Sequence, residues 1–404
     1  MMKTMKMQFK YLCVAALALV GALTTGCSND EPDLDVAMPP AVSDSVSLNT
    51  PLTLEAREAG AKVTFTFSEY KASGDVEYST DGTSWSTYTG GTAITLNSAG
   101  DKVMFRGNCQ TYDQCNISCD KDCYIYGNVM SLISSTGFAT ATELTEGDTF
   151  KDLFKGNEHI VNHDSKPLSL PATKLTRSCY AHMFEGCDNL KTAPVLPATK
   201  LADNCYESMF KACNNLNTAP DLPATKLADN CYAYMFNGCN NLTTAPALPA
   251  TELANNCYES MFNGCSSLET APVLPATKLV VNCYQYMFQD CDRLETAPVL
   301  PATTLADMCY RSMFQSCDNL KTAPVLPATK LTDNCYYEMF CFCYNLSSVT
   351  CLATDITANC CLLDWLEEAG GDVFDEKTLH VRSGQPTDKS YWHVHDDWTV
   401  VADQ

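Results

Sequence analysis

A repeat of 26 residues runs without insertion or deletion through residues 170–351. Seven copies begin at the leucine of a Leu-Pro-Ala-Thr tetrapeptide, and a decayed eighth copy follows, so that the starting residues are Leu170, Leu196, Leu222, Leu248, Leu274, Leu300, Leu326 and Leu352. A strict period of roughly 20–50 residues is typical of a solenoid, in which each unit buries its apolar side only against its neighbours. The sequence therefore predicts a row of stacked coils, an architecture that usually binds or spaces other molecules.

Within each copy, one stretch has the spacing of an amphipathic helix. In the first copy it reads Cys179-Tyr180-x-x-Met183-Phe184-x-x-Cys187. At about 100° per residue these five side chains fall within an arc of about 140°, which is the buried stripe of a short helix. Asparagine precedes the first cysteine in five later copies and is a suitable N-cap; these residues are Asn204, Asn230, Asn256, Asn282 and Asn334. We expect one short helix in each copy.

A short strand is expected after this helix, over Leu190–Ala193, where a leucine begins an alternating pattern. Pro194 and Pro197 lack the backbone N–H that a ladder needs, so the strand should end before them. Parallel strands stack about 4.8 Å apart and helices pack about 8–10 Å apart. We therefore expect the unequal sides to curve the solenoid, with the short parallel strands along its concave edge.

The segment before the repeats has a different pattern. Over residues 46–135, Val63, Phe65 and Phe67 alternate with polar residues, and turn sequences such as Asp81-Gly82 interrupt the alternation. Alternation broken by turns in this way predicts a small all-β sandwich domain.

The ends of the repeat region depart from the repeat pattern. Thr149–Gly156 aligns with Cys179–Gly186 as a degenerate opening copy, so the solenoid is assigned to residues 140–360. Residues 361–404 no longer follow the repeat and are expected to form a C-terminal cap, because the terminal units of a solenoid must cover its open core.

The first 26 residues have the features of a bacterial signal peptide. Lys3, Lys6 and Lys10 precede an apolar run over residues 11–25, which is shorter than the about 20 residues of a permanent membrane helix. The run ends in Leu23-Thr24-Thr25-Gly26-Cys27, which resembles a lipobox, with leucine four residues before the cysteine rather than the usual three. We expect a signal peptide over residues 1–26 and lipidation at Cys27. An ordinary signal peptide with a chance cysteine is the alternative.

Residues 27–45 are rich in Asp, Ser and Pro and predict an extended, lipidated tether. The acidic tract over residues 28–35 resembles the surface-export signal of Bacteroidota-type lipoproteins. The expected location is therefore the outer membrane, with exposure at the cell surface and contact with the membrane through the N-terminal lipid only. The formal net charge of −22 would repel nucleic acid, which is not expected as a partner.

The repeat itself resembles the BspA-like leucine-rich repeat family of bacterial surface proteins. The recurring phrase of that family is a Met-Phe or Ala-Phe pair, a cysteine and a leucine at fixed spacing, and a proline-containing turn; here it stands as Met209-Phe210-x-x-Cys213-x-x-Leu216 and at equivalent positions of the other copies. The resemblance covers about residues 140–360 and implies an α/β leucine-rich-repeat solenoid. Because members are implicated in adhesion to host proteins or cells, it also implies non-enzymatic binding of an extracellular protein or glycan.

Fourteen of the 24 cysteines recur at two positions of the repeat. Cysteines eight residues apart on one helix would lie about 12 Å apart, beyond the about 7 Å that a disulfide can bridge, and neighbouring helices are also too far apart for an unstrained bridge. We therefore expect buried free thiols, with disulfides as the alternative. For Cys109, Cys115, Cys119 and Cys123, which lie outside the repeats, one or two disulfides are a reasonable expectation in an exported domain, and a metal site is the weaker alternative.

No catalytic or cofactor-binding motif is present in the sequence. His393 and His395 could share one strand face, but such terminal pairs are usually surface residues, so neither a metal site nor an enzyme is expected.

Binding specificity is expected at positions that vary within the otherwise constant repeat. Our candidate ligand-binding stripe is the position after the strand leucine, occupied by Lys191, Asn217, Thr243, Glu269, Glu295 and Lys321. A second variable stripe lies on the expected helix, at His182, Ser208, Tyr234, Ser260, Tyr286, Ser312 and Glu338. Neutral drift at solvated positions is the alternative explanation for either stripe, and a structural spacer or surface-coat component without a specific ligand is the alternative function.

Overall fold

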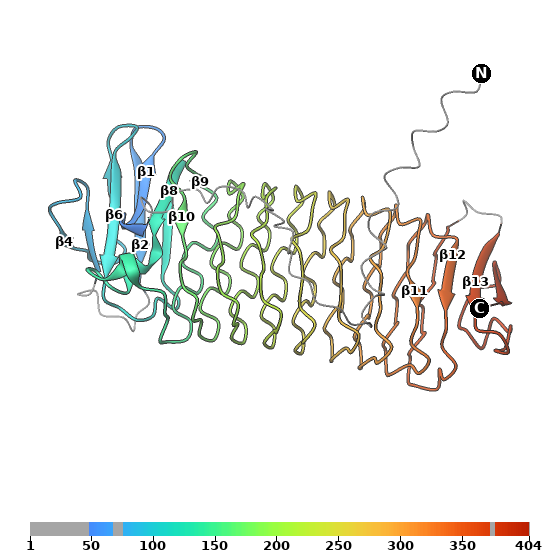
Figure 1. The fold of residues 1–404 in the computed structure, drawn as a ribbon. Helices are drawn as coiled ribbons and strands as arrows, with labels where there is room; N and C mark the ends of the chain where they lie inside the picture. The colour runs from blue at the N-terminus through green and yellow to red at the C-terminus, as the bar shows by residue number, and fades with distance from the viewer. Residues whose placement is uncertain (1–47, 68–75, 372–375, 404) are drawn as a thin grey trace, which may run out of the picture. The chain divides into compact units, whose positions relative to one another are not determined.

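A computed structural model describes residues 48–67, 76–371 and 376–403. The predicted signal peptide, the lipid attachment at Cys27 and the tether lie outside these residues. Within the described ranges, no helix is both long enough and apolar enough to cross a membrane. The described residues fall within one compact unit, Asp44–Gln404, in which a β domain is followed by a row of coils (Figure 1).

The β domain contains two sheets and a shared aromatic core. Its strands are β1 (Leu52–Ala56), β2 (Ala61–Thr66), β3 (Val76–Ser79), β4 (Ser86–Thr87), β5 (Ile94–Leu96), β6 (Lys102–Gly107), β7 (Asn116–Cys119) and β8 (Cys123–Asn128). One sheet has the order β5-β2-β7, and the other contains β8-β1-β6-β3-β4. Phe65 of the first sheet meets Phe105 of the second edge to face, with ring centroids 5.5 Å apart. This two-sheet arrangement agrees with the alternating pattern of the sequence.

The β domain and the coils are joined by hydrogen bonds as well as by the chain. Two 3₁₀ helices, η2 (Val129–Leu132) and η3 (Phe138–Thr140), lead into the opening coil. Two strands, β9 (Ile160–Asn162) and β10 (Leu168–Ser169), then pair in parallel with β8. Strand β8 of the β domain therefore pairs with the N-terminal end of the row of coils.

One edge of each coil carries the parallel pairing that the sequence predicts. Thr192 bridges Thr218, and the equivalent pairs Thr244–Thr270 and Thr296–Thr322 do the same. The pairing consists of single bridges over most of the row. It widens into a four-stranded parallel sheet only at the C-terminal end, whose strands are β11 (Val325–Leu326), β12 (Ser348–Cys351), β13 (Lys377–Val381) and β14 (Trp398–Ala402).

The predicted helices are wrong: no residue from 140 to 360 is α-helical. The stretch from Ser178 to Cys187 is instead a ribbon of successive turns. Every fourth residue has a positive φ, with values of 52° at Ser178, 56° at His182 and 72° at Gly186, and the same positions recur in the following coils. The asparagines expected to be N-caps occupy the first of these left-handed positions, as at Asn204 with φ 58°.

Backbone N–H groups in the ribbon alternate between two kinds of acceptor. The residues at 178, 180, 182, 184 and 186 donate to carbonyls of the next coil at 2.8–3.0 Å, as from Tyr180 to Cys205. The residues between them donate to the carbonyl three residues earlier in the same coil, as from Met183 to Tyr180. The opening copy follows the same rule, because Phe150 donates to Cys179 and Phe154 to Met183. The alignment of this copy with the repeat is therefore confirmed.

The ribbon replaces a helix because every side of a coil must fit the same spacing. Helices pack about 8–10 Å apart, whereas the bridges on the opposite edge set a spacing near 4.8 Å. In the ribbon, the rings of Tyr180 and Tyr206 stack 5.8 Å apart and those of Phe184 and Phe210 stack 5.5 Å apart. Both sides of the row are thus hydrogen-bonded from coil to coil. The difference in spacing between helices and strands, from which we expected curvature, is therefore absent.

The interior of the row consists of columns of identical side chains. Tyrosine, methionine, phenylalanine and both repeat cysteines are buried in all seven copies. The C-terminal end is closed by a different set of residues, in which the Trp365 indole donates to the Trp392 carbonyl at 2.9 Å. Lys377, only 3% exposed, forms an ion pair with Asp397 at 2.5 Å in the same region.

Candidate functional site

The predicted binding stripe forms a continuous row on the bridged edge of the coils. Backbone hydrogen bonds join neighbouring members, from Asn217 to Lys191 at 3.0 Å, from Glu269 to Thr243 at 3.0 Å and from Lys321 to Glu295 at 2.9 Å. All six side chains are solvent-exposed. The structure therefore brings these residues together in register, and whether they contact a ligand remains a prediction.

The two carboxylates of the stripe already have cationic neighbours. Glu295 pairs with Lys321 at 2.9 Å, and Glu269 lies 3.7 Å from Arg293. The four side chains are 57–63% exposed, so water screens both pairs and each contributes little to stability. A polar partner could exchange these contacts for its own at low cost.

The second variable stripe differs from what the sequence suggested. All its residues have positive φ, and three of its serines, Ser208, Ser260 and Ser312, are buried between neighbouring coils. The larger residues project further: Tyr234 donates its hydroxyl to Glu259 at 2.7 Å, and Arg311 lies over the Tyr286 ring at 5.7 Å. This stripe is therefore not a uniform binding surface.

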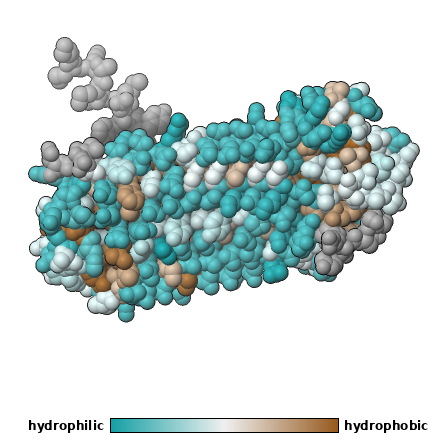
Figure 2. Space-filling view, turned by 180° about the vertical axis from the view of Figure 1, so that it is seen from behind, coloured by the Kyte–Doolittle hydropathy of each residue, from teal (hydrophilic) through white to brown (hydrophobic). Residues whose placement is uncertain are grey.

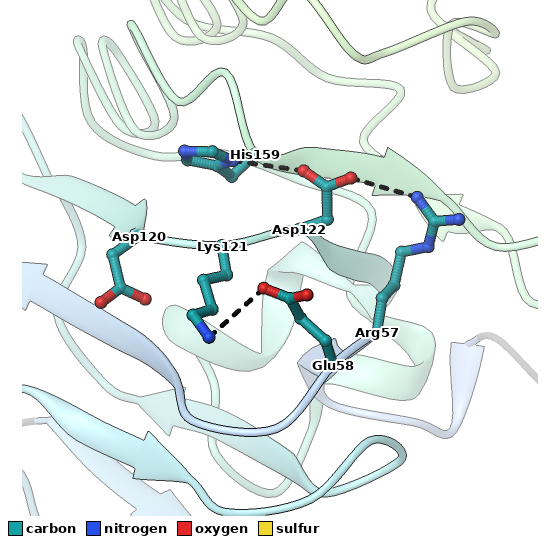
Figure 3. A pocket seen from close by; sticks show the side chains of 6 residues that line it. All are labelled: Arg57, Glu58, Asp120, Lys121, Asp122 and His159. Atoms are coloured by element: carbon teal, nitrogen blue, oxygen red, sulfur yellow. Dashed lines mark hydrogen bonds and ion pairs between the residues drawn. The ribbon is translucent and has the colours of Figure 1, made fainter.

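A hollow of about 460 Å³ is lined by the β domain and by His159 of the opening coil, and the sequence does not predict it (Figure 3). It is lined by charged or ionisable side chains only: Arg57, Glu58, Asp120, Lys121, Asp122 and His159. The Asp122 carboxylate bridges two of them, with 3.2 Å to Arg57 and 3.2 Å to His159 Nδ1. These residues come from three separate segments, so no local sequence pattern marks them.

Chemically, this hollow offers paired donors and acceptors rather than a reactive centre. Lys121 lies 3.3 Å from Glu58 and also donates to the Ala59 carbonyl at 2.9 Å. Three cationic or ionisable donors face three carboxylates, so the hollow has no strong net charge. It could bind a polar molecule, but its ion pairs are already satisfied among themselves.

The cysteines of the repeat are free thiols, as predicted. At the second position the thiol donates to a phenylalanine carbonyl of the preceding coil, as from Cys213 to Phe184 at 3.0 Å. Burial raises the pKa of the Cys213 thiol to about 12, so it stays protonated and unreactive at neutral pH.

The disulfides considered for the four cysteines of the β domain are not formed. None of Cys109, Cys115, Cys119 and Cys123 is in a disulfide, and the last three are buried. Within the described ranges, no three His, Cys, Asp or Glu side chains are placed to hold a metal ion. His395 contacts Glu367 at 3.0 Å.

Figure 2 shows one face of the molecule, on which hydrophobic side chains gather near both ends of the row of coils. The coils between these ends present mainly hydrophilic side chains on that face. On this face, the middle of the solenoid is therefore mainly polar.

Comparison with known families agrees with this architecture. Residues 168–295 and 258–361 match the family described as BspA type leucine rich repeat region, with six copies of the repeat. The chain is therefore a BspA-like leucine-rich repeat protein. No curated protein and no solved structure gives a significant match to the chain.

Proposed function

We propose that this chain is a surface lipoprotein that binds an extracellular protein or glycan without catalysis. The observation that supports it is the in-register row of exposed, variable side chains that begins at Lys191 and ends at Lys321, carried by a repeat whose interior is constant. Solenoids commonly use such extended surfaces for recognition. The lipobox-like sequence ending at Cys27 would hold the protein to the outer membrane, with the solenoid displayed to the outside.

A structural spacer is the second candidate, and one observation favours it. The charges of the row neutralise each other within the protein, as Glu295 does with Lys321. A spacer would depend on the number of coils and would be indifferent to the identity of the stripe residues.

The two candidates can be separated by reversing the central charges of the stripe. Residues 28–404 would be screened against extracellular matrix proteins and glycans, and any partner would then be tested with the double variant Glu269→Lys, Glu295→Lys. If both carboxylates contact the partner, binding should weaken by about 1–3 kcal/mol. The unfolding free energy should change by only about 0.5 kcal/mol, because both side chains are exposed.

A matched control is available on another row of the same coils. Glu252 pairs with Lys226 at 3.0 Å and is as exposed as the stripe residues, so Glu252→Lys makes elsewhere the same charge change as each single substitution of the double variant. Binding that is equally affected by this control would indicate a general electrostatic effect. A partner that binds the double variant normally would exclude the stripe as its site.

A further inference from the structure

The seventh coil differs from the six before it at three solvent-side positions. It carries Tyr337, Phe342 and Tyr344 where the earlier coils have only polar or small residues. The residues equivalent to Phe342, for example, are Gly186, Ala212, Gly238, Gly264, Asp290 and Ser316. Because the repeat fixes the same backbone in each coil, the earlier coils show that the fold itself does not require aromatic rings here.

These aromatic residues remain in part accessible to solvent. Tyr344 is 40% exposed, Tyr337 and Phe342 are half-buried, and the rings of Phe342 and Tyr344 have centroids 6.3 Å apart. The Arg311 guanidinium lies 4.8 Å from the centre of the Tyr337 ring and 5.7 Å from the centre of a further ring, that of Tyr286. We call these five residues the aromatic patch.

The backbone conformation at Phe342 indicates that the phenylalanine ring does not serve the stability of the fold. Its φ is +61°, the left-handed region that a bulky side chain rarely adopts. Glycine, which has no such restriction, occupies this position in three of the earlier coils. Strained residues that persist on a surface are often part of a functional site.

Carboxylates border the aromatic patch on two sides. Burial first, and then the nearby carboxylates of Glu338, Glu367 and Asp364, raise the pKa of the Cys341 thiol. On the other side, Asp318 occupies the position of Tyr344 in the preceding coil. Burial first, and then the carboxylates of Asp318 and Asp290, raise the pKa of the nearby Asp292 carboxyl. Arg311 is the cation within the patch, so the surface combines exposed rings with an excess of negative charge.

We propose that the aromatic patch of coils five to seven docks a basic protein segment, with apolar side chains seated on Phe342 and Tyr344 and arginines facing the surrounding carboxylates. Aromatic residues with an arginine are the usual composition of protein-binding hot spots. The contact of Arg311 with the two tyrosine rings is the one that an incoming guanidinium would repeat. None of the five patch residues belongs to the stripe that ends at Lys321.

The test uses the full chain and a short synthetic peptide in which arginine alternates with leucine. The variant Phe342→Gly, Tyr344→Asn restores residues found in earlier coils and leaves the charge unchanged. It should lower the affinity for this peptide about tenfold, as expected for loss of hot-spot side chains. Binding of a matched peptide in which serine replaces leucine should be weaker in the wild type and unaffected by the variant.

Folding is controlled in the same experiment. Phe342→Gly removes a left-handed phenylalanine, so the thermal unfolding temperature of the variant should not fall. Ala212→Gly, at the equivalent position of the second coil, should leave peptide binding unchanged. Equal binding of both peptides to the wild type, or full binding of the leucine peptide by the variant, would overturn the proposal. Self-association, or binding of a neutral oligosaccharide, that is lost in the variant would also overturn it by assigning the patch to another occupant.

Discussion

Replacing the glycines of the turn ribbon by alanine should change the free energy of unfolding in one direction for a turn ribbon and in the opposite direction for a helix. Gly186, Gly238 and Gly264 have φ values of 72°, 74° and 72° and occupy the same position in three coils. An added Cβ would meet no close atom, since at Gly238 the nearest is the Ala212 Cα at 3.7 Å. The substitution therefore tests backbone conformation with little contribution from steric contact.

The expected magnitude follows from two opposing terms. A non-glycine residue in the left-handed region costs about 1–2 kcal/mol. The lower conformational entropy of alanine in the unfolded chain offsets this cost by about 0.4–1 kcal/mol. Each substitution should therefore destabilise the protein by about 1 kcal/mol. The triple variant should be less stable than any of the single variants. In a helix, the same change from glycine to alanine would stabilise by about 1 kcal/mol per site.

Urea unfolding followed by circular dichroism measures this difference directly. The triple variant should show a lower midpoint than the wild type at an unchanged slope. The reciprocal variant Ala212→Gly, whose alanine has φ 57°, should be as stable as the wild type or more stable. A triple variant with increased stability would refute the turn ribbon and restore the helix that the sequence pattern predicts.

Three further predictions concern the anchor, the thiols and acid stability. Cys27→Ala should leave an unlipidated precursor that no longer partitions with membranes, which fractionation of cells would measure. Under denaturing, non-reducing conditions, the fourteen repeat cysteines should all react with iodoacetamide, because they are free thiols. His182, hydrogen-bonded at 2.7 Å, and then Lys155 lower the pKa of Glu185 from 4.5 to about 2. Since this pKa is lower in the folded protein, Glu185 should stabilise it above pH 4.5, and this advantage over Glu185→Gln should disappear as the pH falls from 4.5 towards 2.

The period of the repeat predicts the stacking of coils because an identical apolar set in each copy can be buried only against its neighbours. The parallel pairing after Leu190 follows from the same argument, and the proline residues limit it to single bridges over most of the row. These features depend on the spacing between copies, which a sequence states without ambiguity.

The sequence pattern predicts a helix within each copy, and this prediction is wrong because two periods coincide over a short stretch. Cys179, Tyr180, Met183, Phe184 and Cys187 are spaced by four residues in pairs, and over nine residues a period of four is hard to distinguish from the 3.6 of a helix. A signal was nevertheless present. Asparagine and glycine, the residues that best tolerate a positive φ, stand eight residues apart in two copies, at Asn230 and Gly238 and at Asn256 and Gly264.

Other features leave no trace in the sequence. The hollow around Asp122 is assembled from the β1–β2 and β7–β8 turns and from His159, which are distant along the chain. The ion pairs of Glu269 and Glu295 depend on the register between neighbouring coils. Such features require the three-dimensional arrangement, whereas the patch of coil seven could be recognised by comparing the copies with one another.

The alternation of hydrogen bonds in the ribbon has a mechanical consequence. Half of the ribbon N–H groups hold one coil to the next, so a force applied to the two ends of the chain loads these bonds before any covalent bond. A stacked coil occupies at most the 5.5–6.0 Å that separates the centres of neighbouring rings. Once peeled off and extended, its 26 residues span about 90 Å. Under tension, the solenoid should therefore lengthen in discrete steps of one coil, each step releasing slack and limiting the force transmitted through the rest of the molecule.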